Sequence, residues 1–139
     1  MINKAKNNLV AAQRIIDAND ASICFASIHC SYYAVFQFMK YLLANLKRGD
    51  ISYDKQKEIC GGADSHDTIL SKIRGELPGK NFRKERQLVE DIRLLKNVRV
   101  SADYTLEPFS VLDCIEIKQE AEAIIKKLQS LFNDKITRA

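Results

Sequence analysis

The sequence predicts an all-α fold, a four- to five-helix up-and-down antiparallel bundle. Apolar residues recur at spacings of three and four in five separate segments, which is the period of a helix that buries one face. No segment shows a convincing alternation of apolar and polar residues, the pattern of a half-buried strand. Short connections join most of the segments and favour antiparallel neighbours. The length of 139 residues fits one domain, residues 1–139.

The first two helices differ in how much of their surface is apolar. One apolar stripe predicts a short amphipathic first helix that ends near Asn19 and Asp20, both of which can cap the next helix. The members of that stripe are Ile2, Ala5, Leu9, Ala12 and Ile16. The second helix, from about 21 to 46, is apolar nearly all round, which is typical of a helix at the centre of a bundle.

A change of pattern separates the second helix from the third. Residues 47–64 combine mixed charges with three glycines, which predicts a long exposed loop. Ser65 can cap the third helix, which carries His66 at the head of an apolar face. Pro78 and the glycine after it then end this helix.

Two further helices complete the predicted bundle. The fourth runs from about 81 to 101, and a break follows at Glu107 and Pro108. The fifth opens at Ser110, which forms an S-x-x-D capping pattern with Asp113. The residues expected to face inward on the fifth helix are Cys114, Ile117, Ala121, Ile124, Leu128 and Leu131.

An arginine occupies a buried register position near the end of the fourth helix. Leu88, Ile92 and Leu95 recur at helical spacing, and Arg99 continues that series. Burying an unpaired charge costs several kcal/mol, so Arg99 needs a carboxylate, a phosphate or a water-filled cleft beside it. Asp103 is such a carboxylate, four residues on. Two readings follow: the pair is only structural, or it holds the guanidinium in place for a ligand.

Basic residues are concentrated in one part of the chain, although the net charge is only +4. Residues 72–99 hold nine Lys and Arg against four Asp and Glu, whereas residues 100–139 hold five against seven. A solvated helix face explains such a cluster, and so does an anionic partner such as RNA or a nucleotide. Five of these basic residues project away from the apolar stripe of the helix that carries Arg99 and could guide an anionic strand toward it: Arg83, Lys84, Arg86, Arg93 and Lys96. Aromatic residues suited to base stacking are not interleaved among the basic residues from Arg83 to Lys96.

Other site classes are not predicted. Polar residues throughout the first 15 positions argue against a signal peptide. No run of about 18 apolar residues is present to span a bilayer. A cytoplasmic protein with no membrane partner is therefore expected. The four cysteines lack metal-type spacing and are expected to be reduced thiols. No zinc-type cluster and no glycine-rich phosphate loop is present, so neither a metal nor a cofactor is predicted.

Three motifs follow one another in a characteristic order. SIHCSYYAVFQFMKYLL lies at 27–43 on the second helix, DSHDTIL at 64–70 opens the third, and RVSADY at 99–104 ends the fourth. Their order and spacing resemble the HEPN domain, particularly small stand-alone bacterial and archaeal members with an Arg-x-x-Ala-Asp-Tyr signature. The resemblance covers nearly the entire chain. It implies a HEPN-like bundle that pairs as a homodimer, with the fourth-helix signatures facing one another across a cleft.

The resemblance also implies an activity. Many HEPN proteins are similar to metal-independent ribonucleases, often toxins partnered by a minimal nucleotidyltransferase, in which an Arg followed four to six residues later by His carries the chemistry. Here Tyr104 stands five residues after Arg99, where that motif has its histidine. The candidate catalytic residues are Arg99, Asp103 and Tyr104, and the candidate nucleic-acid or nucleotide ligands are Arg99, His66, Arg93 and Lys96.

Each candidate has a chemical role and a structural alternative. Metal-free RNA cleavage needs a base for the 2′-hydroxyl, a stabilised phosphate and an acid for the leaving oxygen; Arg99 suits the second task. Tyr104 would stand about 140° round an unbroken helix from Arg99, so the two converge only if the helix ends between them or across a dimer. His66 is interpreted as a capping or packing residue or as an acid–base group, and His29 as buried structure.

Three functions are compatible with these residues. The leading hypothesis is a helical homodimer that binds RNA or a nucleotide phosphate in a cleft through Arg99, either as a toxin-like metal-independent ribonuclease or with that activity weakened or lost. The alternative is a non-catalytic protein–protein interaction module, for example the partner of a minimal nucleotidyltransferase antitoxin. A nucleotide-binding module is a third hypothesis.

Overall fold

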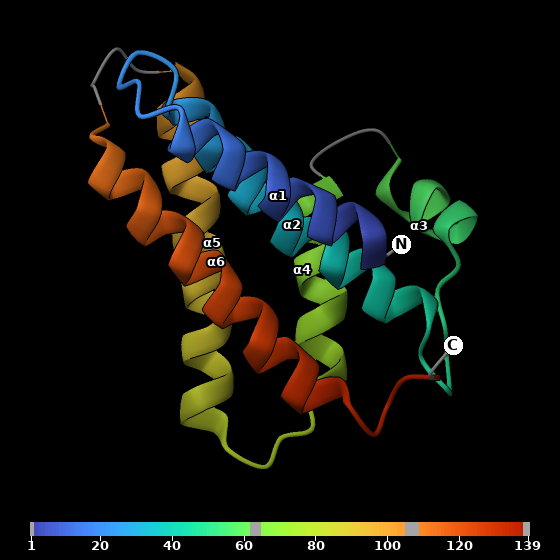
Figure 1. Ribbon diagram of the computed structural model, residues 1–139. Helices are drawn as coiled ribbons and strands as arrows, with labels where there is room; N and C mark the ends of the chain where they lie inside the picture. The colour runs from blue at the N-terminus through green and yellow to red at the C-terminus, as the bar shows by residue number, and fades with distance from the viewer. Residues whose placement is uncertain (1, 62–64, 105–108, 138–139) are drawn as a thin grey trace.

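The computed structural model describes residues 2–61, 65–104 and 109–137 (Figure 1). These residues form six α-helices and no strand, which confirms the all-α prediction; four or five helices were predicted. The helices are α1 (Ile2–Asp17), α2 (Phe25–Ala44), α3 (Tyr53–Cys60), α4 (Ser65–Glu76), α5 (Phe82–Tyr104) and α6 (Val111–Phe132). None of these helices is both long and apolar enough to cross a membrane.

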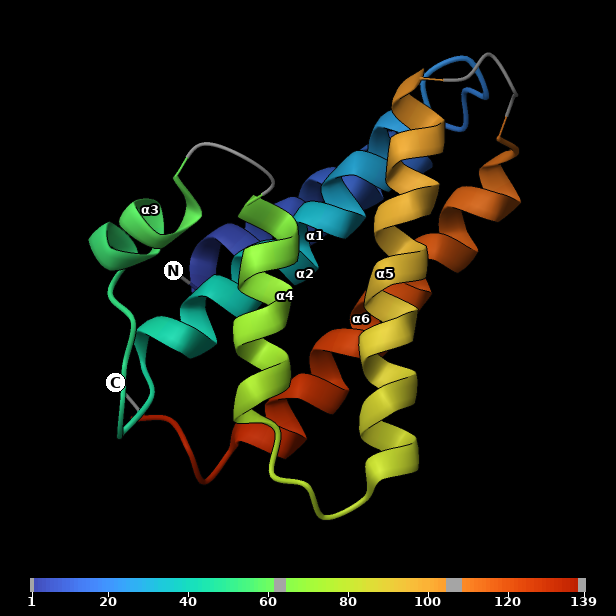
Figure 2. The same cartoon turned by 180° about the vertical axis from the view of Figure 1, so that it is seen from behind.

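α2 lies at the centre of the fold. Figure 1 shows α1 and α6 in front of it, and Figure 2 shows α4 and α5 on its other side, where they run side by side. α2 is buried on nearly every side because its sequence is apolar nearly all round. Its largest fully buried side chains are Ile28, Tyr32, Phe38, Met39, Leu42 and Leu43. The prediction of a central second helix is confirmed, and every other helix of the site is positioned against it.

A turn precedes α2, so the helix begins four residues later than predicted. The carboxylate of Asp20 accepts hydrogen bonds from the backbone N–H and the hydroxyl of Ser22, at 2.9 and 2.6 Å. Asn19 adopts a left-handed conformation with φ of 50°, which reverses the chain after α1. Asp20 therefore stabilises this turn, and α2 itself starts at Phe25 without a side-chain cap.

The prediction of a continuous loop over 47–64 is wrong, because α3 lies within it. Ser52 caps this helix by accepting from a backbone N–H at 3.3 Å, and Gly61 ends it in a left-handed conformation. The only buried residue of α3 is Gln56, whose amide donates to two backbone carbonyls at 3.0 and 2.8 Å. A short helix attached by a polar side chain has no apolar stripe, which is why periodicity missed it. Residues 62–64 lie outside the described residues.

The last two helices match their predicted starts. α5 presents Leu88, Ile92 and Leu95 to the core and continues to Tyr104, three residues past its predicted end. α6 starts after Ser110, whose hydroxyl accepts from the Asp113 N–H at 3.0 Å while the Asp113 carboxylate accepts from the Ser110 N–H at 3.0 Å. This is the reciprocal capping box that the S-x-x-D pattern predicts. The break predicted at Glu107 and Pro108 lies outside the described residues.

Candidate functional site

Arg99 lies near the end of α5, against α2, with most of its side chain buried. Its side chain is 16% exposed, and its Nε lies 3.1 Å from Oδ2 of Asp103, one turn further along the helix. The guanidinium carbon lies 5.4 Å from the ring centre of Tyr33 on α2. The register argument for Arg99 is therefore confirmed, and the carboxylate at i,i+4 is the group beside it.

The Arg99–Asp103 contact does not satisfy the guanidinium. Its buried Nε–H makes no hydrogen bond in the described part of the chain, although the carboxylate oxygen is close, so the N–H and the oxygen are misaligned. The terminal N–H groups likewise donate no hydrogen bond to a described residue. Buried polar groups nearly always have partners, and an arginine carries five donors. Arg99 therefore has charge balance from Asp103 but unused hydrogen-bonding capacity.

His29 of α2 brings an imidazole into the same place. Its Nδ1 lies 3.6 Å from Oδ2 of Asp103, the oxygen that also faces Arg99, and its ring stacks on Tyr33 with centres 4.4 Å apart. The His29 side chain is 45% exposed, so its interpretation as buried structure is wrong. We call Arg99, Asp103, His29 and Tyr33 the Arg99 cluster.

Sequence reasoning missed His29, although a signal for it was present. His29 and Tyr33 are one helical turn apart on α2, as Arg99 and Asp103 are on α5, so each pair shares a helix face. Only the docking of α5 onto α2 brings the two pairs together. The rotation of one helix against the other is set by packing of the whole core, which no local pattern shows.

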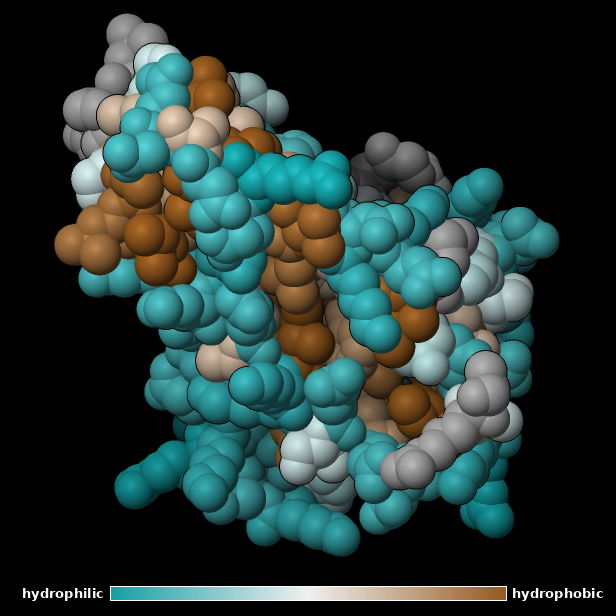
Figure 3. Space-filling view, viewed as in Figure 1, coloured by the Kyte–Doolittle hydropathy of each residue, from teal (hydrophilic) through white to brown (hydrophobic). Residues whose placement is uncertain are grey.

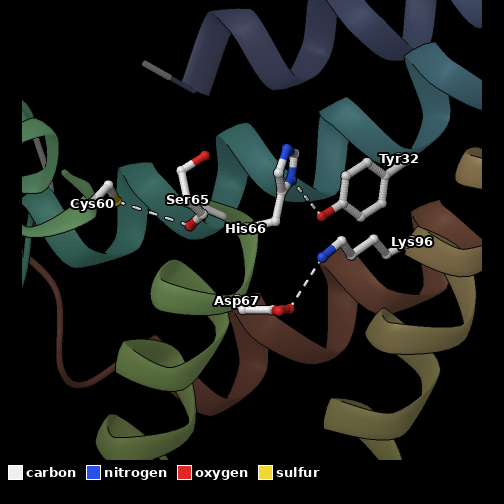
Figure 4. Close-up of polar contacts among 6 residues, drawn as sticks. All are labelled: Tyr32, Cys60, Ser65, His66, Asp67 and Lys96. Carbon is white, nitrogen blue, oxygen red and sulfur yellow. Dashed lines mark hydrogen bonds and ion pairs between the residues drawn. The ribbon is translucent and has the colours of Figure 1, made fainter. Parts of the chain in front are cut away.

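His66, at the start of α4 (Figure 4), contacts Tyr33 of the Arg99 cluster. Its Nδ1 shares a 2.8 Å hydrogen bond with the Tyr32 hydroxyl, and its ring stacks on Phe36 with centres 4.3 Å apart. Tyr33 contacts the same ring edge-on, at 5.8 Å between centres. His66 is thus held among α2 aromatics, as its packing interpretation expects, and Tyr33 connects it to Arg99.

Lys96 and Asp67 form a second charged contact across α4 and α5. The Lys96 Nζ lies 3.1 Å from Oδ1 of Asp67, as Figure 4 shows. Asp67 is 63% exposed and Lys96 is 21% exposed at the side chain. Since Lys96 lies one turn before Arg99 on α5, this pair borders the Arg99 cluster on the α4 side.

Two further candidates lie away from the Arg99 cluster. Tyr104 is 80% exposed at the last position of α5. Because α5 is unbroken from Arg99 to Tyr104, the two side chains leave the helix in different directions and do not converge within one chain. Arg93 is half exposed further down α5, where its Nη1 lies 3.9 Å from Oε2 of Glu90.

The Arg99 cluster combines two chemical capacities at one surface. A permanently charged guanidinium with unused donors suits a phosphate, which accepts several hydrogen bonds at once. A half-exposed imidazole beside a carboxylate suits proton transfer. Among the described residues, no group of three or more His, Cys, Asp and Glu side chains is placed to hold a metal ion.

No protein-family model matches this chain, and searches of curated proteins and of solved structures found no significant match. The HEPN resemblance therefore stays a prediction, and the function is inferred from the geometry of the Arg99 cluster.

Proposed function

We propose that the Arg99 cluster binds an RNA phosphate and that the protein is a metal-independent ribonuclease. The observation that carries the proposal is the position of His29, 3.6 Å from the carboxylate oxygen that also pairs with Arg99. The HEPN motif implies a histidine shortly after the arginine on one helix, and this chain has Tyr104 there. In the proposed site, α2 supplies the imidazole instead.

Arg99 has the role of binding and stabilising the phosphate. Its terminal N–H groups donate to no described residue, so they can donate to two phosphate oxygens together. The Tyr33 ring, 5.4 Å from the guanidinium carbon, limits the rotation of the guanidinium. Charge that builds up on the phosphate during attack by the 2′-hydroxyl is then stabilised by a donor set already in place.

His29 has the role of moving the proton. Asp103 lies beside Nδ1, so Nε2 is the nitrogen left to take the proton from the 2′-hydroxyl. The reaction needs a second proton for the leaving oxygen. A homodimer with two Arg99 clusters facing a shared cleft, the arrangement that the resemblance implies, would provide one imidazole for each proton.

Exposed apolar side chains beside the Arg99 cluster support pairing at this end of the molecule. Phe25, one turn before His29 on α2, is 45% exposed, and Val100, next to Arg99, is 36% exposed. Tyr104 is 80% exposed at the same end of α5. Burial of these side chains against a second copy would bring Tyr104 near the other copy's cluster. Light scattering at tens of micromolar protein tests this: a monomer would rule out the shared cleft.

The ribonuclease proposal is tested with single-stranded RNA in EDTA. Wild-type protein should cleave it, and Arg99→Ala and His29→Ala should each slow cleavage about 100-fold or more, because each removes a group needed in the transition state. Arg14→Ala, an exposed arginine on α1, is the control and should cleave like wild type. If no protein cleaves the RNA, but wild type binds it and Arg99→Ala does not, the ribonuclease proposal fails and only phosphate binding by Arg99 is supported.

An interaction module is the second candidate, and one surface favours it. Leu112, at the start of α6, is 62% exposed, and Figure 3 shows apolar side chains gathered at this end of α6. Phe109 and Val111 beside it are partly buried. A partner protein, for example a nucleotidyltransferase, would cover this surface. Leu112→Asp should then abolish co-purification with such a partner and leave RNA binding unchanged.

A further inference from the structure

We propose that the groove between α4 and α5 binds single-stranded RNA and delivers it to the Arg99 cluster, an inference that rests on the proposed function of that cluster. The groove has a volume of about 600 Å³ and lies at the loop that joins the two helices. Figure 2 shows α4 and α5 side by side above this loop. Its walls include Arg74 from α4 and Phe82, Arg86 and Arg93 from α5.

The groove is positively charged. Arg74 and Arg86 form no ion pair with a described residue, and Arg93 makes only a loose 3.9 Å contact with Glu90. The other carboxylate in the wall, Glu85, is turned inward, where both of its oxygens accept backbone N–H groups. Guanidinium groups without carboxylate partners attract a phosphate backbone and release its counterions on binding.

An exposed aromatic ring lies among these arginines. Phe82, the first residue of α5, is 78% exposed and lines the groove. The faces of bases in a duplex are covered by their neighbours, whereas the bases of a single strand can stack on an aromatic side chain. In the sequence Phe82 directly precedes Arg83, at the edge of the basic run from Arg83 to Lys96; in the fold it lines the same groove as Arg74 of α4 and Arg86 of α5. The surface therefore fits a single strand better than a duplex.

The groove continues toward the Arg99 cluster. A second hollow, of about 310 Å³, shares Arg74 and Arg93 with the first and adds Asp67. Asp67 pairs with Lys96, which lies one turn before Arg99 on α5 (Figure 4). The cationic side chains thus follow α5 from the loop up to the Arg99 cluster, while Asp67 places one negative charge on the route.

Binding is measured with a fluorescent 2′-O-methyl oligouridylate of about 12 nucleotides, which lacks the attacking hydroxyl and stays intact, over a series of salt concentrations. The double variant Arg74→Ala/Arg86→Ala should weaken binding about tenfold. It should also lower the magnitude of the slope of the log binding constant against log salt concentration by about 1.4, because each phosphate contact on a single strand contributes about 0.7 to that slope. Phe82→Ala should weaken binding about tenfold with no change in slope, since it removes stacking.

Two variants calibrate these results. Lys84→Ala removes an exposed α5 charge that lines neither hollow, so binding should stay within about twofold of wild type. Asp67→Asn should tighten binding about threefold, because it removes the negative charge from the route. Both arginines and Phe82 are exposed, and thermal unfolding checks that each variant is folded.

The outcomes separate this inference from the ribonuclease proposal. The groove proposal is overturned if the Arg74→Ala/Arg86→Ala double variant and the Phe82→Ala variant both bind the oligonucleotide as tightly as Lys84→Ala does. It is also overturned if a duplex of the same length binds as tightly as the single strand. Either result counts against the groove even if Arg99→Ala stops cleavage. If the groove variants lose binding as expected but wild type leaves cleavable RNA intact, the groove is supported and the ribonuclease proposal fails.

Discussion

Two charged side chains of α5, Glu85 and Arg99, show different solutions to partial burial. Glu85 is 5% exposed, and its two carboxylate oxygens accept the backbone N–H groups of Gly79 and Asn81 at 2.9 and 3.0 Å. Arg99 lies 3.1 Å from a carboxylate but donates no hydrogen bond to a described residue. A charge whose hydrogen bonds are complete stabilises the fold, whereas one with donors left over is suited to a ligand.

The largest effect is expected at Glu85. Glu85→Ala should lower the free energy of unfolding by about 3 kcal/mol, because two charge-assisted hydrogen bonds that shape the loop before α5 are lost. Urea denaturation followed by circular dichroism measures this loss.

Glu90→Ala is the matched control for Glu85→Ala. Glu90 lies on the same helix, and its side chain is 53% exposed. Its removal should change the free energy of unfolding by no more than about 0.5 kcal/mol. If both variants lose the same free energy of unfolding, the hydrogen bonds of Glu85 stabilise the fold no more than a surface carboxylate does.

Asp103→Asn tests whether the Arg99–Asp103 pair is only structural or also serves phosphate binding and proton transfer. Removing the charge leaves Arg99 for the phosphate and takes the carboxylate from His29, so binding of the 2′-O-methyl strand should tighten while cleavage slows about tenfold. Binding and single-turnover cleavage are measured on the same preparation. If stability falls and neither binding nor cleavage changes, Arg99 and Asp103 form only a structural ion pair.

A third buried group, the thiol of Cys114 on α6, extends the comparison to a side chain that stays neutral. It donates a hydrogen bond to the Cys24 carbonyl at 3.2 Å, and burial raises its pKa from the usual 9.0 to about 11. The folded state therefore holds a proton between about pH 9 and pH 11 that the unfolded state releases. Stability should fall as the pH rises through that window.

The effect at Cys114 is expected to be smaller than those at Glu85 and Asp103, and it is measured as a difference between wild type and Cys114→Ala. Unfolding free energies measured at about pH 8 and about pH 10 should decrease less in Cys114→Ala than in wild type, because the variant has no thiol to ionise. The same decrease in both proteins would show that groups other than Cys114 cause the loss of stability at alkaline pH.

Local patterns were sufficient for most of the helices and for one residue of the site. Apolar spacing predicted α1, α2, α4, α5 and α6, and the Ser110–Asp113 capping box is where the S-x-x-D pattern puts it. The same spacing showed that Arg99 has to face inward with Asp103 beside it. These features depend on residues within one or two helical turns, so the sequence contains all that they need.

Tertiary packing decided the remainder of the site. His29 is 70 residues from Arg99, and it meets Asp103 only because α5 docks on the face of α2 that carries it. The groove of Arg74 and Phe82 likewise exists only because α4 and α5 both pack on α2 and leave a hollow between them. Contacts between distant segments depend on how a whole core fills its volume, and no window of the sequence records that.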